Sequence, residues 1–133
     1  MAVNFESLLG ETLIKINATE DSIRFYTDTH VYVLMHDQDC CEKVEIESIV
    51  GDLDDLIGSP ILLAEEASNY WNASKDSKLL HALMSNEPQS PYDESWTWTF
   101  YKLATIKGFV DIRWYGSSNG YYSESVSFYR HNY

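Results

Sequence analysis

Three consecutive segments near the end of the chain restrict its fold more than any other feature. These segments are WTWTFYKLATI (96–106), FVDIRWY (109–115) and YYSESVSFY (121–129). Each is rich in the aromatic and β-branched residues that favour strands. Lys107-Gly108 and Asn119-Gly120 separate them, and both dipeptides suit tight hairpin turns. The segments therefore predict a three-stranded antiparallel meander.

Two-residue loops at both turns would set the register of this meander. The residues expected to face each other are Lys102 and Arg113, Ala104 and Asp111, and Tyr115 and Glu124. Successive side chains of a strand point to opposite faces. The face expected in the core carries Tyr101, Leu103, Val110, Ile112, Trp114, Ser125 and Ser127. The outward face carries Phe100, Lys102, Ala104, Asp111, Arg113, Tyr115, Tyr122, Glu124, Val126 and Phe128.

The first half of the chain has the same strand chemistry in shorter segments. Apolar and β-branched runs bounded by polar turn residues predict strands over 12–17, 23–27, 31–36, 43–50 and 61–65. Asp28-Thr29 predicts a hairpin turn between two of these strands. Residues 4–9 predict a short helix or turn. Asp52 is expected to cap a helical turn that ends by Gly58.

Residues 67–94 differ from the rest, because they are rich in Ser and Asn and show no strand alternation. We expect an irregular or partly helical excursion there, with a short helix over 75–84. The whole pattern predicts a mainly β fold of about seven strands with one or two short helices. An antiparallel β-sandwich or a half-barrel fits this pattern, with residues 1–133 as a single domain.

Negative charge is concentrated in the first half. The formal net charge is −12, and residues 1–66 hold 15 acidic and 3 basic residues, whereas residues 67–133 hold 6 of each. Such a field repels nucleic acid and attracts basic surfaces, although acidic surfaces also serve solubility alone. We therefore expect no direct nucleic-acid binding and a partner protein with a basic surface. The expected contact residues are Asp37, Asp39, Glu42, Glu45, Glu47, Asp52, Asp54 and Asp55.

Nothing in the sequence predicts a membrane segment. The chain has no run of about 18 apolar residues, and its first residues lack the basic region and apolar core of a signal peptide. We therefore expect a cytoplasmic protein in which Cys40 and Cys41 remain thiols. Adjacent side chains of an extended chain also diverge, which disfavours a disulfide between them.

The stretch HDQDCCE (36–42) gathers several metal-binding side chains. The candidate ligands are His36, Asp39, Cys40 and Cys41. Zinc sites usually take separated pairs such as C-x-x-C, and this chain has no second pair. The acidic surroundings also disfavour a reactive thiolate at Cys40. We interpret the stretch as a polar junction between two strands and keep metal binding as a minor hypothesis.

The outward face of the meander offers a candidate ligand site. An arginine among aromatic side chains suits anions, nucleotides or carboxylates. The candidate residues are Lys102, Asp111, Arg113, Tyr115, Tyr122 and Glu124. Cross-strand ion pairs on a solvated face would explain the same pattern. No G-x-S-x-G, H-E-x-x-H or phosphate-binding glycine loop occurs, so we expect no enzyme activity and no cofactor.

Three stretches together resemble an uncharacterised family of small proteins from tailed phages, prophages and their bacterial hosts. They are HDQDCCE, VGDLDDLIGSPILLAEEAS and SWTWTFYKLATIKGFVDIRWYGSSNGYYSESVSF. The resemblance covers about residues 8–129. It implies a phage or mobile-element product made inside a bacterial cell, and it transfers no catalytic residues.

Small acidic phage proteins often bind and block a host protein, including defence nucleases. From the charge and the resemblance we expect a non-enzymatic inhibitor of a host factor, of the anti-defence or anti-CRISPR type. Its acidic surface would stand in for nucleic acid. A protein that binds or sequesters a nucleotide or signalling molecule is the second hypothesis. A metal-binding protein built on HDQDCCE is the third.

Overall fold

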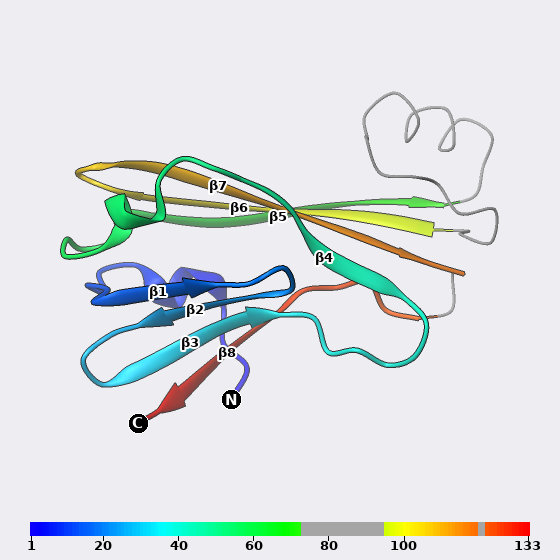
Figure 1. Ribbon diagram of the computed structural model, residues 1–133, viewed down its shortest axis with the longest axis horizontal. Helices are drawn as coiled ribbons and strands as arrows, with labels where there is room; N and C mark the ends of the chain where they lie inside the picture. Colours follow the sequence, from blue (N-terminus) through cyan, green and yellow to red (C-terminus); the bar gives the residue numbers. More distant parts are fainter. Residues whose placement is uncertain (73–94, 120–121) are drawn as a thin grey trace.

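The chain folds into two facing antiparallel sheets (Figure 1). The computed structural model describes residues 1–72, 95–119 and 122–133. One sheet has the strand order β1-β2-β3-β8, and the other has the order β4-β7-β6-β5. The predicted antiparallel β-sandwich is therefore confirmed, with eight strands in the described residues.

The strands are β1 (Lys15–Ala18), β2 (Ser22–Tyr26), β3 (His30–Met35), β4 (Lys43–Val50), β5 (Leu63–Asn72), β6 (Ser95–Thr105), β7 (Gly108–Ser118) and β8 (Ser127–Asn132). Two short 3₁₀ helices accompany them, η1 (Phe5–Leu8) and η2 (Leu53–Leu56). None of the helices in these described residues is long and apolar enough to cross a membrane.

Local chemistry explains the elements that were predicted well. The Asp28-Thr29 hairpin forms, because Tyr26 pairs with Val31 and the Thr27 N–H donates to the His30 carbonyl at 2.9 Å. Asp52 caps η2 as expected, since its carboxylate accepts the Asp54 N–H at 2.9 Å.

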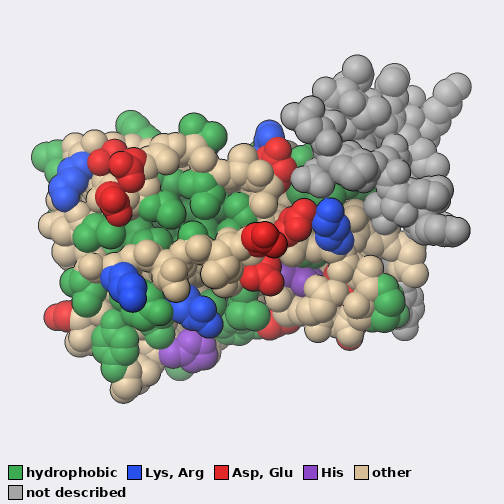
Figure 2. Space-filling view, in the orientation of Figure 1, with side chains coloured by type: hydrophobic (Ala, Val, Ile, Leu, Met, Phe, Trp, Pro, Cys, Tyr) green, Lys and Arg blue, Asp and Glu red, His purple; other side chains and the backbone are tan. Residues whose placement is uncertain are grey.

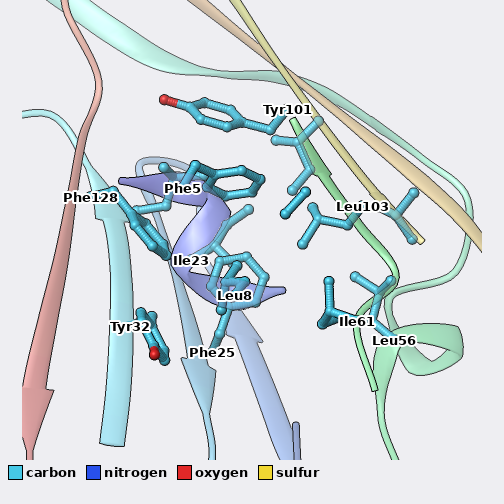
Figure 3. Close-up of a cluster of buried hydrophobic side chains, with 14 of the residues drawn as sticks. Phe5, Leu8, Ile23, Phe25, Tyr32, Leu56, Ile61, Tyr101, Leu103 and Phe128 are labelled. Atoms are coloured by element: carbon cyan, nitrogen blue, oxygen red, sulfur yellow. The ribbon is translucent and has the colours of Figure 1, made fainter. Parts of the chain in front are cut away.

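The core lies between the sheets and combines aromatic with aliphatic side chains (Figure 3). Phe5 of η1 reaches between the sheets, where its ring lies 4.6 Å from that of Tyr101 and 5.1 Å from that of Phe128. Phe128 also stacks on Tyr32 at 5.5 Å. Each such buried side chain contributes roughly 1.5–3 kcal/mol relative to an exposed one. The aromatic contacts therefore join η1 to both sheets.

The register between β6 and β7 differs from the prediction by two residues. Thr105 pairs with Gly108, so the turn is Ile106-Lys107, and Lys102 faces Asp111 rather than Arg113. Gly108 lies in the strand beside Asp55, whose Oδ2 would be 2.8 Å from an added Cβ. A shift of two residues preserves the faces of a strand. The meander residues of β6 and β7 predicted to face the core are therefore all buried: Tyr101, Leu103, Val110, Ile112 and Trp114.

The last predicted strand joins the other sheet, so the three-stranded meander is wrong. β8 pairs with β3, and Leu34 faces Phe128. Phe128 therefore points into the core, not outward. Residues 122–126 cross from one sheet to the other, and the expected pairing of Tyr115 with Glu124 is not formed. Burial of Phe128 against both sheets outweighs the local preference for a hairpin.

The predicted irregular segment 67–94 starts too early. Residues 67–72 continue β5, which pairs with β6 up to Asn72 opposite Ser95. Pairing with a long, aromatic partner strand outweighs the weak strand propensity of Ser and Asn. The rest of this segment, including the predicted helix over 75–84, lies outside the described residues.

Candidate functional site

The HDQDCCE stretch is the junction between β3 and β4, as predicted, and Glu42 lies at its centre. The Glu42 side chain is buried, with the residue only 4% exposed. Its carboxylate accepts the backbone N–H groups of Asp39 at 2.8 Å and Cys40 at 2.9 Å. The amide of Gln38 donates to the Glu42 carbonyl at 2.8 Å. Glu42 therefore organises the loop, and its assignment to an acidic surface is wrong.

His36 connects this loop to the crossover segment before β8. Its Nδ1 lies 2.6 Å from the Ser125 carbonyl, which only accepts, so Nδ1 carries a hydrogen. Its Nε2 lies 2.7 Å from Glu42 Oε2. Burial raises the pKa of Glu42, but the N–H groups of Cys40 and Asp39 together with His36 lower it by more, to about 2. Glu42 is therefore held as a carboxylate.

The structure does not assemble a metal site from His36, Asp39, Cys40 and Cys41. Both nitrogens of His36 are already hydrogen-bonded. No group of three potential ligands occurs in the part of the chain that the structure describes. Cys40 and Cys41 form a disulfide, so the prediction of two thiols is wrong. That prediction assumed an extended chain, whereas residues 36–42 lie outside the strands, where adjacent side chains need not diverge.

The remaining predicted acids do not form one surface. Asp37 accepts a hydrogen bond from the Tyr129 hydroxyl at one end of the junction. Glu45 pairs with Lys43 at 3.2 Å, and Glu47 pairs with Arg113 at 2.5 Å. The face in Figure 2 shows separate acidic groups with cations beside them. Strand alternation and local ion pairs disperse the charge that the sequence concentrates.

One acidic group adjoins exposed apolar side chains. Asp52 and Asp54 are exposed on η2, and Asp55 is half-buried. η2 contacts the β6–β7 turn, where the Thr105 hydroxyl donates to the Asp55 carbonyl. Val50, Ile106 and Phe109 are 64%, 84% and 70% exposed at the same end. We call Val50, Asp52, Asp54, Asp55, Ile106 and Phe109 the η2 patch; an exposed apolar cluster rimmed by charge is typical of an interaction site.

Half of the predicted ligand site forms a groove on the outer face of the β4-β7-β6-β5 sheet. The groove has a volume of about 270 Å³ and is lined by Ser48, Val50, Phe100, Lys102, Asp111 and Arg113. Arg113 is held in place, because its guanidinium lies 5.0 Å from the Trp98 ring and bonds to Glu47. This hydrogen bond lowers the pKa of Glu47 and raises that of Arg113. Both charges therefore persist at the groove.

The other half lies elsewhere. Tyr115 is buried against Trp98, with ring centroids 4.8 Å apart. Glu124 is buried on the opposite face of the sheet, where it accepts hydrogen bonds from Thr97 at 2.8 Å, Ser118 at 2.6 Å and Ser95. Tyr122 is half-buried in the crossover segment. Tyr122 and Glu124 were placed in the groove by the incorrect third strand, whereas Tyr115 lies on the outer face as predicted but is buried.

A model of a domain family of unknown function, DUF7448, matches residues 6–128. The chain belongs to the DUF7448 family. The DUF7448 match begins inside η1 and ends inside β8, so it spans both sheets. The expectation of an uncharacterised family is confirmed. No curated protein and no solved structure matches the chain.

The sequence reasoning missed two buried carboxylates that organise the fold. Glu42 and Glu124 were both interpreted as surface residues, and both are buried, at 4% and 6% exposed. One signal was present for Glu42, because His36 directly follows β3 and Glu42 directly precedes β4. For Glu124 the sequence has no such signal, since its hydroxyl partners Ser95 and Thr97 lie far away in the chain.

Proposed function

We propose that this protein is a non-enzymatic binding protein that inhibits a host protein by covering a basic surface with the η2 patch. The observation that carries the proposal is that η2, with exposed Asp52 and Asp54, packs on the β6–β7 end of the sheet, where Ile106 and Phe109 are also exposed. Apolar area supplies affinity, and the carboxylates select a partner with lysines or arginines. The net charge of −12 favours the same partner over long distances.

The resemblance to phage and prophage proteins supports a bacterial host protein as the target. A nucleic-acid-binding groove of a defence protein has the basic and partly apolar chemistry that the patch requires. In this proposal the protein acts in the cytoplasm and binds neither nucleic acid nor membrane. The internal hydrogen bonds of Glu42 and Glu124 support a structural role for these acids rather than a catalytic one.

The test compares two variants with matched charge changes. Asp52→Asn/Asp54→Lys retains a cap on η2 but reverses the charge of the patch. Glu20→Gln/Asp28→Lys makes the same change at exposed acids of the other sheet. Each variant is used to recover partners from host lysate and to inhibit the recovered partner in its own assay.

We expect the patch variant to lose both the partner and the inhibition, while the control variant keeps both. Binding should weaken between about 0.1 M and 1 M salt, where the Debye length falls from about 10 Å to 3 Å. If both variants lost binding and inhibition equally, the η2 patch would not be a specific site, and binding would depend only on the overall negative charge.

The groove favours a second candidate function, the binding of a small molecule. Lys102 and Arg113 would bind an anionic group, and Phe100 would contact an aromatic one. Native mass spectrometry of protein purified from cells should then show a stoichiometric adduct that is lost in Lys102→Ala. A mass without adduct from several hosts would contradict this function.

A further inference from the structure

The two sheets have four edge strands, and three of these edges are protected. β1 has only four residues. β8 is covered by the N-terminal residues, since Val3 donates to the Phe128 carbonyl at 3.0 Å and Arg130 donates to that of Met1 at 2.9 Å. β4 has a register irregularity between Ile46 and Ser48, and its Ile46 N–H donates to the Glu20 carbonyl. Short strands, bulges and covering loops all prevent pairing with another chain.

β5 is different. It has ten residues, and the side chains of residues 65–70 are exposed. Within the described parts of the chain, β6 is the only strand that pairs with β5. The N-terminal segment bonds to the residues just before β5, where the Ile61 N–H donates to the Glu11 carbonyl at 2.9 Å, and η1 packs against β5 itself without pairing with it as a strand. A long unprotected edge is a template for strand addition.

An acidic hollow lies beside this edge, on the inner face of the sheet. It has a volume of about 390 Å³ and is lined by Asn4, Phe5, Glu6, Glu66, Val126 and Phe128 among others. Glu6 and Glu66 are both exposed and come from η1 and β5. The hollow therefore combines two carboxylates with a mostly polar lining, in which Phe5 and Phe128 are almost fully buried.

A buried hydroxyl without a partner lies next to Glu66. Tyr101 faces Glu66 across the β5–β6 pairing, so the two side chains share the inner face. Tyr101 is fully buried, and its hydroxyl makes no hydrogen bond of normal length within the described residues, although burial and the nearby Glu66 carboxylate raise the pKa of Tyr101. Figure 3 shows this hydroxyl pointing out of the core cluster, on the side of Phe128. A buried polar atom without a partner costs stability, so a ligand that bonds to it gains affinity.

We propose that the free edge of β5 binds an extended segment of a partner protein and that a Lys or Arg side chain of this segment enters the hollow between Glu6 and Glu66. The N–H groups of that side chain bond to the two carboxylates and to the Tyr101 oxygen. The partner backbone continues the β4-β7-β6-β5 sheet.

This inference rests on the proposed function, because it specifies how a basic partner is held. A second copy of the chain does not supply the same chemistry. The ten residues of β5, LAEEASNYWN, contain no lysine or arginine, so pairing two copies of β5 leaves Glu66 without a cation. Glu65, on the other face, already lies opposite Lys102. Glu66 is therefore the acid of β5 that is left for the partner.

The probe is a ten-residue, threonine-rich peptide with one central arginine, matched to the length of β5. Two control peptides test the contributions of the arginine charge and of the peptide backbone separately. One replaces arginine by citrulline, which removes the charge. The other carries N-methyl groups on alternate residues, which keeps the charge but removes backbone donors. Binding is measured by calorimetry and by the shifts of backbone amide signals.

We expect the parent peptide to bind about tenfold or more tightly than either control and to shift the amides of β5. Glu6→Gln/Glu66→Gln should weaken binding by a similar factor, and Glu20→Gln/Asp28→Lys, at exposed acids of the other sheet, should leave it unchanged. The inference is overturned if the N-methylated peptide binds equally well, if no peptide binds, or if the shifts lie at the η2 patch. In the last case the proposed function stands and only the β5 site fails.

Two proline variants test the backbone directly. Consecutive N–H groups of a strand point to opposite sides. Of the two variants Ala67→Pro and Ser68→Pro, one therefore removes a donor from the free edge, and the other removes a donor that bonds to β6. The variant that keeps the wild-type melting temperature should lose peptide binding about tenfold or more. Light scattering should give the mass of one chain, and a dimer dissociated by that variant would instead assign the edge to a second copy.

Discussion

The imidazole Nε2 of His36 lies 2.7 Å from Oε2 of Glu42, inside the junction between β3 and β4. This contact joins the end of one sheet to the start of the other. Through Nδ1 the same ring bonds to the Ser125 carbonyl before β8. One buried pair therefore holds both crossings between the sheets, and it is the part of the fold that single substitutions test most directly.

Glu42→Gln should loosen this junction. The substitution keeps the size of the side chain but removes the charge that accepts from His36, Asp39 and Cys40. We expect a lower melting temperature and faster hydrogen exchange at the Asp39 and Cys40 amides. Asp37→Asn, at an exposed acid of the same loop, is the control and should change both quantities less. Equal effects of the two substitutions would contradict a central role for Glu42.

Acid should destabilise the protein through the same residue. The pKa of Glu42 is about 2 in the folded chain against an ordinary value of 4.5. Because the folded pKa is lowered, its contribution is complete above pH 4.5 and is lost as the pH falls toward 2. Denaturant titrations between these values should show a steeper loss of stability for the wild type than for Glu42→Gln. Parallel curves would show that Glu42 does not carry this dependence.

Arg113→Lys should have a modest effect on stability. The guanidinium lies over Trp98 and bonds to Glu47, but the Arg113 side chain is 40% exposed. Solvent screening limits such an ion pair, so we expect a loss of roughly 0.5–1 kcal/mol in the free energy of unfolding. High salt should reduce this difference, and a loss of several kcal/mol would mean that the pair is more buried in solution.

Gly116→Ala should be costly despite its small size. An added Cβ would lie 3.0 Å from both the Cβ and the backbone oxygen of Glu124 and 3.2 Å from Val44. We expect a loss of about 1–3 kcal/mol, because the crossover segment must move away from β7. Ser123→Ala, at an exposed residue of the same segment, should change stability by less than about 0.5 kcal/mol. A neutral Gly116→Ala would contradict the close passage of residues 122–126.

The sequence by itself determined the class of fold and most of its strands. Alternation along 43–50 and 96–115 places side chains on two faces, and this alternation is a local property that any register shift of two residues preserves. For this reason the buried set around Tyr101 and Trp114 was predicted correctly although the β6–β7 register was not.

Only the tertiary structure decided which distant segments meet. Phe128 packs against Phe5 and Tyr32, so β8 joins the other sheet, and this separates Glu124 from the groove that Arg113 lines. The same long-range packing brings Glu6 beside Glu66 and buries Glu42. Such contacts depend on the free energy of burial summed over both sheets. The alternation of side chains along a single strand does not reveal this sum.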